Sequence, residues 1–593
     1  MSLIRKLKKI PLQICILNLL ATYILVATVV MITGDVEFYY IEFIETVPIS
    51  QMIICGVIIF TMLMVMESFI EMKGLPVFVA AILHCVICAC IRTSDVYYTV
   101  CCLSVFGLLI FYLIQSDLLN FHVSISNKEL MAFVIVEYCV IFGLTAYANV
   151  LRYKSYNSST FDFGIFAQMY ENMAKTGLMG VSCERNVISN HLLVHFSPIY
   201  YVLLPFYMLF RTPSFLVAVQ PMVVLSGVFP LVLICKKHDL SNVITAALSS
   251  VFLFYPTFTA ACYYDFHENL FLTPILMWLM YFIECDDNQD KCKKGTIIFS
   301  VLAAMIKEDA GLYLCCIGFY LIFYKCRKRA GAFMISFALI VFFATTSYIS
   351  AFGDSTLPTQ HYQNLIPPGE KGMIAALKTM VLDPGYLMTQ LLSAEKIIFL
   401  IQMLLPLMLL PFLNRKISQL FLTLPLFAVS LITTYGYQFD IDYQYSFGTG
   451  ALLVFMAVDN ISNIKSHKCR KYILIMMVLA SILLMLNNNV SKYNYYCETY
   501  RNEQYNIGLT DEVIDSIDES ASVTASTFLV PRLYNHNEVY MLGNDCVESD
   551  YILIDTRRRD EDAQAERYYY EIGYTQVLEQ GYIIMLKKPN EIN

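Results

Sequence analysis

Apolar stretches long enough to span a lipid bilayer recur along this chain from Leu12 to Leu486. A transmembrane helix needs about 20 mostly apolar residues, because the hydrocarbon core is about 30 Å thick. Only 15% of the 593 residues are charged, whereas soluble proteins carry about 25%. The sequence therefore predicts an all-α polytopic membrane protein with about fifteen transmembrane helices.

The distribution of Lys and Arg predicts the orientation. Cytoplasmic loops carry an excess of these residues. If the basic N-terminus up to Lys9 is cytoplasmic and begins a retained first helix, almost every later basic cluster also falls inside. These clusters are Glu71–Lys73, Ser126–Lys128, Lys236–His238, Lys291–Lys294, Lys325–Arg329, Arg415–Lys416 and Lys465–Lys471. The agreement requires that the apolar segment His191–Phe210 lies on or dips into the outer surface without crossing.

Two loops and a tail then share the outer face. The loops are residues 152–210 and 352–395, within a membrane domain of residues 129–488. Residues 1–128 form an N-terminal extension of four helices. The tail, residues 489–593, has 9 Lys and Arg against 19 Asp and Glu, a net charge of −10. Its alternating runs predict a small soluble α/β domain, with strands near 521–525, 538–542, 551–555 and 581–586 and helices near 511–517 and 562–570.

The 19 cysteines lie mostly inside apolar segments, where Cys behaves as a small hydrophobe. Cys497 and Cys546 fall in the tail and could pair if it is extracellular. No charge pattern indicates nucleic acid.

Asp162 follows a predicted transmembrane helix on the outer side and is flanked by aromatic residues. A partly desolvated carboxylate has a raised pKa and makes a usable general base. The alternative is that it caps a following helix. His191 and His195 are four residues apart, which predicts one face of a helix and a phosphate or metal contact. Two polar positions on an interfacial helix are the alternative.

Two further clusters of ionisable residues border apolar spans. Asp265, His267 and Glu268 precede one span, and Asp265 and Glu268 also have the spacing of a capping box. Lys307-Glu308-Asp309 lies between two short apolar stretches. Charges near hydrocarbon are costly and are kept for function, so Lys307 is a candidate phosphate partner. Snorkelling is the alternative for this lysine.

Other outer residues are candidates for binding. Arg185 belongs to a basic set, with Arg152, Lys154 and Lys175, that could draw an anionic lipid headgroup to the site. Ordinary solvated loop charges are the alternative. Tyr443 and Gln444 form a polar aromatic approach to an outer helix, or simply anchor it at the interface.

Four motifs carry a resemblance to a known family. Asp162-Phe-Gly-Ile-Phe166, His195-Phe-Ser-Pro198, Asp265-Phe-His267 and Lys307-Glu-Asp309 resemble signature positions of the bacterial and archaeal membrane proteins called domain of unknown function 2079. The tail segments 526–533, 538–540 and 550–555 resemble it too. The resemblance covers about residue 130 to the end and leaves the first four helices as an extension.

That family is similar to the GT-C superfamily of polytopic glycosyltransferases, which use polyprenyl-phosphate sugars on the outer face. The resemblance implies a GT-C-like fold, an essential acid at Asp162 and a juxtamembrane helix at His191–Phe210. Many relatives have two adjacent acids at this point, whereas Phe163 follows Asp162 here.

The resemblance and the residues together predict a plasma-membrane glycosyltransferase that moves a sugar from a polyprenyl-phosphate lipid to an unidentified acceptor. No metal or other cofactor is required, because the polyprenyl phosphate is a good leaving group; a divalent ion is compatible with this chemistry. The predicted catalytic acids are Asp162, Asp265 and Glu308. The predicted binding residues are His191, His195, His267, Glu268, Lys307, Asp309, Arg185, Tyr443 and Gln444.

Two other functions make different predictions. A transporter or flippase predicts charges near mid-bilayer and paired repeats with broken helices, but the charges lie at predicted outer ends and no internal repeat is visible. A surface scaffold without a catalytic site predicts charged clusters far apart in space.

Overall fold

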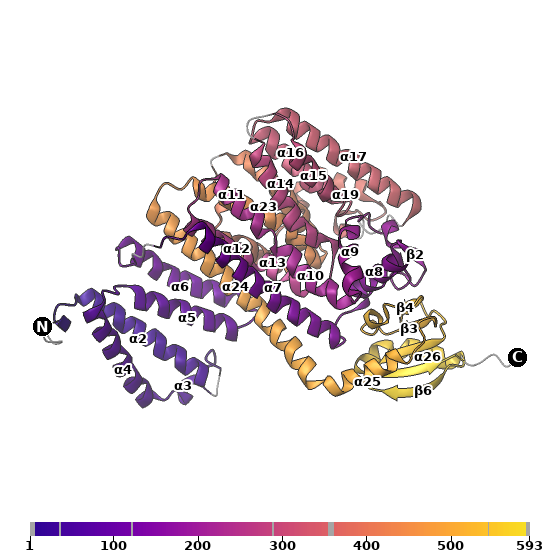
Figure 1. Ribbon diagram of the computed structural model, residues 1–593, viewed down its shortest axis with the longest axis horizontal. Coiled ribbons are helices and arrows are strands. Elements are labelled where there is room, and N and C mark those ends of the chain that lie inside the picture. Colours follow the sequence, from indigo (N-terminus) through magenta and orange to yellow (C-terminus); the bar gives the residue numbers. More distant parts are fainter. Residues whose placement is uncertain are drawn as a thin grey trace.

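The computed structural model describes residues 6–34, 37–119, 123–286, 290–353, 361–414, 416–543 and 545–588. Predictions about Arg415, Asn593 and residues 354–360 of the second outer loop lie outside these ranges. The chain is mostly helical, with one small sheet domain at its C-terminal end (Figure 1). The predicted fold class of a polytopic helical protein with a C-terminal α/β domain is therefore confirmed.

In the described part of the chain, eight helices are long and apolar enough to cross a membrane, and a pair bent by 73° would make nine. The predicted count of about fifteen is not confirmed, because several predicted spans are short or broken. The eight are Leu12–Thr33 (α2), Ile49–Phe69 (α4), Val96–Gln115 (α6), Asn127–Lys154 (α7), Pro213–Lys237 (α10 to Leu225 and α11 from Val228), Asn242–Thr259 (α12 to Leu253 and α13 from Pro256), Lys328–Phe352 (α17) and His467–Asn502 (α24). The bent pair is Pro384–Gln390 (α20) and Ala394–Leu407, which contains α21 (Ala394–Leu404).

Shorter helices and turns complete the extension and the membrane domain. They include Phe43–Thr46 (α3), Leu75–Ile91 (α5), Ile165–Thr176 (α8), Tyr200–Phe210 (α9), Leu272–Cys285 (α14), Lys294–Ala304 (α15), Ala310–Phe323 (α16), Met373–Leu382 (α19), Leu424–Ile432 (α22) and Phe447–Ser462 (α23). A two-stranded ribbon, Gly180–Val181 (β1) with Ser189–Asn190 (β2), lies in the first outer loop.

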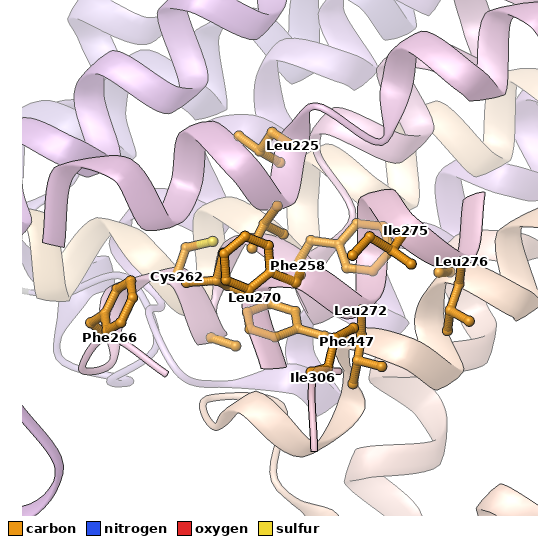
Figure 2. Packing of buried hydrophobic residues seen from close by; sticks show 14 of the residues in the cluster. Leu225, Phe258, Cys262, Phe266, Leu270, Leu272, Ile275, Leu276, Ile306 and Phe447 are labelled. Carbon is orange, nitrogen blue, oxygen red and sulfur yellow. The ribbon is translucent and has the colours of Figure 1, made fainter. Parts of the chain in front are cut away.

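One apolar core holds the membrane domain together. Figure 2 shows Phe258, Leu270, Ile306 and Phe447 in this packed cluster with residues of α14. Between membrane helices such side chains contribute mainly through van der Waals packing, because lipid tails are as apolar as the side chains themselves. Phe266 and Ile306 belong to the same cluster and directly adjoin the charged residues of the predicted site in sequence. The core therefore anchors the backbone on which those charges are carried.

The four-helix extension packs on the long helix α24. Apolar residues of α2, α5 and α6 form a separate buried cluster with Met476, Leu479 and Leu483 of α24. In Figure 1, α24 runs between the N-terminal helices and the tail domain. It continues to Asn502, well past the predicted end at 488, and joins the membrane domain to Gln504–Asp515 (α25).

Loops predicted to share the inner face meet at one end of the bundle. His238 lies 4.0 Å from Glu284 and 3.8 Å from Asp459, while Lys325 pairs with Glu284 at 2.8 Å. His238 and Lys325 follow α11 and α16, whereas Glu284 and Asp459 lie in the last turns of α14 and α23. Their contacts agree with the predicted grouping of these loops at one end. That this end faces the cytoplasm stays a prediction.

The segment His191–Phe210 begins and ends on one side of the molecule. His191 contacts Glu184 of the first outer loop, and Arg211, just past the segment, bonds Glu171 of α8 at 2.8 Å. The segment therefore does not cross, as the charge distribution required. Its predicted helical form is wrong at the start: a short 3-10 turn at His191–Leu193 (η2) precedes α9, which begins only at Tyr200.

The tail forms a five-stranded sheet of order β4-β3-β5-β7-β6, with one helix of the tail packed on one face and apolar residues of α25 clustered on the other. Strand β3 pairs in parallel with β4 and β5, and β7 pairs antiparallel with β5 and β6. The strands are Val523–Ala525 (β3), Val539–Met541 (β4), Tyr551–Asp555 (β5), Thr575–Gln580 (β6) and Ile583–Lys587 (β7), and the helix is Arg559–Glu571 (α26). The predicted strands are confirmed. Strand β6 was missed because its side chains are mostly exposed and carry no apolar pattern. Cys497 and Cys546 are both free thiols.

The orientation can be tested with reporter fusions. A reporter placed after Lys588 is expected to be active only if it works outside the cytoplasm, and one placed at Lys465 only if it works inside. The reason is the excess of basic residues in the loops that meet at the inner end. A cytoplasmic tail would reverse the whole topology, because the tail and the first outer loop are in contact.

Candidate functional site

Asp162 lies in an irregular turn between α7 and α8. The turn is a π-helical segment, Thr160–Gly164 (η1), in which Phe163 is buried. Thr160 is tied to the tail domain, because its backbone N–H donates to Thr527 Oγ1 at 3.1 Å and its hydroxyl donates to the Thr527 carbonyl at 3.1 Å. Anchored on both sides, the Asp162 side chain keeps 28% of its surface exposed.

A chain of charged contacts leads inward from Asp162. Its Oδ2 lies 3.9 Å from His267 Nε2, and His267 Nδ1 lies 2.7 Å from Glu268 Oε2. Glu268 Oε1 then pairs with Lys307 Nζ at 2.9 Å. The Tyr200 hydroxyl also donates to Glu268 Oε2. Residues from three distant segments thereby form one continuous polar network.

Burial and pairing set the charges of this network. Burial alone would raise the pKa of Glu268, but His267 and Lys307 outweigh it and hold that pKa well below its ordinary value. Burial alone would likewise lower the pKa of Lys307, but Glu268 and the acids that follow Lys307 raise it. Lys307 is thus a buried ammonium ion at neutral pH.

Asp265 forms an ion pair with a different cation, Arg152. Arg152, in the last turn of α7, donates to both carboxylate oxygens of Asp265 at 2.8 and 3.1 Å. Only 1% of the Asp265 side chain is exposed. Burial raises the pKa of Asp265, and the guanidinium acts in the opposite direction. The pair fixes the end of α7 against the segment that carries His267.

Glu308 joins the histidines of the first outer loop to the site. Its Oε1 lies 2.9 Å from His195 Nδ1, and its Oε2 accepts from the Phe196 backbone N–H at 3.1 Å. Burial opposes ionisation, but His195 outweighs it and lowers the pKa of Glu308 to about 2. His191 Nδ1 lies 3.1 Å from Glu184, and the His191 and His195 rings meet edge to face with centroids 6.0 Å apart.

His191 has one free ring nitrogen. Within the described part of the chain, the buried Nε2 of His191 has no hydrogen-bond partner. Burial lowers the pKa of His191, but Glu184 and Glu268 more than offset this and raise it. A buried imidazole with a raised pKa and a free N–H is suited to bind an anion.

Asp309 lies at the edge of the network. The residue is exposed, but the protein around its carboxyl group desolvates that group. This desolvation raises the pKa of Asp309 to about 6, because the acid Glu308 adds to it and Lys307 only partly opposes it.

An aromatic wall that the sequence did not reveal faces the cations. His361, in the second outer loop, stacks on Tyr435 with ring centroids 4.0 Å apart, and Tyr445 packs edge-on against both. Burial, followed by the charges of Lys307 and His195, lowers the pKa of His361 to about 4. A lone His in a loop gives no sequence signal; only its position in the fold identifies it.

The remaining predicted binding residues divide into two groups. Tyr443 packs edge-on against Tyr264 with centroids 4.7 Å apart, and the Tyr264 hydroxyl donates to Asp162 Oδ2 at 3.3 Å. Gln444 is buried, and its Oε1 has no partner among the described residues. Arg185 lies beside Glu184 with an exposed side chain, so it borders the histidine pair instead of the chain from Asp162 to Lys307.

The other three cations of the predicted basic set are dispersed. Arg152 binds Asp265, Lys175 contacts Glu171 at 3.6 Å, and Lys154 is exposed. They do not form a single anion-binding surface.

The tail domain clamps the first outer loop. Ser182 and Asn186 bond the backbone of edge strand β4 at Val539 and Met541, with distances of 2.6 to 2.9 Å. Arg557 donates to the Tyr156 carbonyl at 2.9 Å. The loop that carries Asp162 is therefore braced by the tail.

The local structural alternatives do not account for the charged residues. Helix α8 begins at Ile165, after Gly164, so Asp162 does not cap it. The turn that begins at Glu268 has no side-chain cap, and Asp265 binds Arg152 instead. Lys307 is buried in an ion pair and does not snorkel. The contacts also exclude the separated clusters expected of a scaffold without a site.

Among the described residues, no group of three or more His, Cys, Asp or Glu side chains is arranged to hold a metal ion. The site is instead an ordered set of acids and bases around a buried lysine.

Comparison with known proteins identifies the family and the fold. A family model described as "Predicted membrane protein (DUF2079)" matches residues 152–585. No curated protein sequence matches the chain.

The solved structures that are similar to the chain include two of ArnT from Cupriavidus metallidurans. The crystal structure of ArnT from Cupriavidus metallidurans bound to undecaprenyl phosphate has 9% identity and a TM-score of 0.50, covering 78% of this chain and 98% of ArnT. The apo form of ArnT has 10% identity and a TM-score of 0.45, and the match covers 77% of this chain and 98% of ArnT. The ligand-bound structure shows that the chain has the GT-C-like fold that the sequence predicted.

Proposed function

This chain belongs to the DUF2079 family of predicted membrane proteins, and we propose that it is a membrane glycosyltransferase. It would move a sugar from a polyprenyl-phosphate donor to an acceptor hydroxyl at the outer surface. The fold of ArnT, solved with undecaprenyl phosphate, supports a polyprenyl lipid as the donor. The observation that carries the proposal is the network of contacts that joins the partly exposed Asp162 to the buried ammonium of Lys307.

The acids of the site differ in whether a carboxylate oxygen is free to accept a proton from the substrate. Both carboxylate oxygens of Asp265 bind Arg152, and those of Glu308 bind His195 and Phe196. We therefore assign these two acids, predicted as catalytic from the sequence, to positioning. Asp162 is paired with no Lys or Arg among the described residues and is the better candidate for general base.

The proposed reaction requires one proton acceptor and one anion site. The acceptor oxygen attacks the anomeric carbon, its proton passes to Asp162, and the bond from that carbon to the phosphate oxygen breaks. The polyprenyl phosphate leaves with the bonding electrons. Lys307 and His191 would stabilise the charge that develops on this phosphate, since fixed cations act most strongly in a site that excludes water. His267 lies between Asp162 and Glu268 and orients the base.

The activity itself can be tested in two ways. Lipid-linked sugars extracted from a deletion strain are expected to contain one species that accumulates, because the enzyme that consumes it is missing. The purified full-length protein is then expected to release polyprenyl phosphate from that species when the acceptor fraction is added. Unchanged lipid-linked sugars in the deletion strain would count against the proposal.

Donor binding is expected to weaken as the pH rises through about 6. Above this pH Asp309 becomes a carboxylate and repels the donor, and below it the neutral acid does not. The donor phosphodiester keeps one negative charge throughout, so the change comes from the protein. Binding measured from pH 5 to 7.5 is expected to show this slope in the wild type and a clearly smaller slope in Asp309→Asn, in which His191 still titrates. If the wild type and Asp309→Asn show the same slope, the pH dependence of donor binding comes from His191 or His195, which titrate in both proteins.

A further inference from the structure

A large groove lies at the end of the molecule away from the candidate site. It has a volume of about 1180 Å³ and is bounded by α5 and α6 of the extension, by α12 and by the first turns of α24. Helix α24 starts here at His467 and ends at Asn502, beside the tail domain. At about 1.5 Å per residue its 36 residues extend roughly 54 Å, so the groove and the tail lie at opposite ends.

The walls of the groove are apolar along most of their length. Ile82 of α5, Ile244 and Ala247 of α12, and Leu474 and Val478 of α24 line it. α12 and α24 each belong to a segment that is long and apolar enough to cross a membrane, so lipid acyl chains are the apolar ligand expected beside these walls. Drug-sized ligands fill about 300–1,000 Å³, and this groove exceeds that range. Its shape and chemistry suit a long hydrocarbon chain.

The mouth of the groove is basic. Lys468 pairs with Asp117 at 2.8 Å, and Lys471 Nζ donates to the Leu119 carbonyl at 2.5 Å. Arg470 also lines the mouth, and its guanidinium makes no hydrogen bond or ion pair with the part of the chain that is described. The mouth contains two acids, Asp117 and Asp239. Its three permanent cations therefore outnumber its carboxylates.

We propose that this groove binds one anionic phospholipid. The acyl chains would lie along α12 and α24, and the phosphate would bind Arg470 and Lys471. Basic pockets between transmembrane helices on the cytoplasmic side bind such headgroups, and the basic loops predict that this end is cytoplasmic. Since the walls come from both the extension and the membrane domain, the lipid would also join these two parts. The proposal does not depend on the glycosyltransferase reaction.

Native mass spectrometry of the full-length protein in neutral detergent can test this site. Phosphatidylglycerol and phosphatidylcholine with identical acyl chains are the probes. We expect retention of one phosphatidylglycerol and weaker retention of phosphatidylcholine. Arg470→Gln should weaken phosphatidylglycerol binding about fivefold, because a basic residue near an anionic headgroup contributes about 1 kcal/mol. Ala247→Phe should weaken binding, because its ring obstructs the apolar part of the groove while every charge is kept.

A matched control separates this site from general surface charge. Lys465 is exposed, lies five residues before Arg470 and does not line the groove. Lys465→Gln removes the same charge and should leave binding unchanged. Equal losses in Lys465→Gln and Arg470→Gln, equal retention of the two lipids by the wild type, or full binding by Ala247→Phe would each overturn the proposal. Each variant is compared with the wild type for thermal stability, so that a folding defect is recognised.

Discussion

Replacing Asp162 by Asn is expected to lower the rate of sugar transfer by about 10²–10⁴-fold, the range found for general bases. The substitution keeps the size of the side chain and an oxygen that can still accept from Tyr264. It removes the proton acceptor next to His267. Because the Asp162 side chain is partly exposed and Thr160 and Phe163 hold the turn, the fold and donor binding should be preserved. Initial rates and donor affinity, measured on the same purified protein, check both expectations.

Asp383→Asn is a suitable matched control. Asp383 is exposed in the second outer loop, and its side chain caps α20 by accepting from the Tyr386 backbone N–H, which Asn can also do. The same chemical change there should leave the rate unaltered. Full activity in Asp162→Asn would move the base to another carboxylate, and Asp309, which is accessible and has a raised pKa, would then be the next residue to replace.

The sequence predicted which residues share a side but not how they pair. Charge distribution placed the Asp162, Asp265 and Lys307 clusters together on one face, and their contacts bear this out. The pairing of Arg152 with Asp265 joins residues 113 positions apart. Such a contact depends on how α7 packs against α10 and the turn after α13, and no local spacing encodes that packing. For this reason the sequence could not show which acids were free to react.

Local sequence patterns also gave wrong predictions where a polar residue can either cap a helix or pair with a distant residue. Asp265 and Glu268 have the spacing of a capping box, but a buried guanidinium is a stronger partner for a carboxylate than a backbone N–H. His191 and His195 were predicted to share a helix face. In the structure a single 3-10 turn carries His191, and the His195 backbone N–H donates to the His191 carbonyl at 3.0 Å. Their proximity was predicted correctly, but the continuous helix was not, because α9 begins only at Tyr200.

The second large effect is expected at the buried pair of Glu268 and Lys307. Only 9% of the Lys307 side chain is exposed and none of the Glu268 side chain. Glu268→Gln leaves the ammonium of Lys307 buried without its direct counterion. Breaking a buried pair in this way costs about 3–5 kcal/mol, so the variant should melt at a clearly lower temperature. Thermal unfolding in detergent, monitored at pH 7, measures this loss.

The double variant Glu268→Gln with Lys307→Met separates stability from function. Replacing both partners removes both buried charges, and such replacements are often neutral for stability. The double variant should therefore regain most of the melting temperature lost by Glu268→Gln alone. It should not regain donor binding, because the cation that would hold the phosphate is gone. Recovery of both properties would show that Lys307 serves only to neutralise Glu268, and the phosphate site would then have to be sought at His191 and His195.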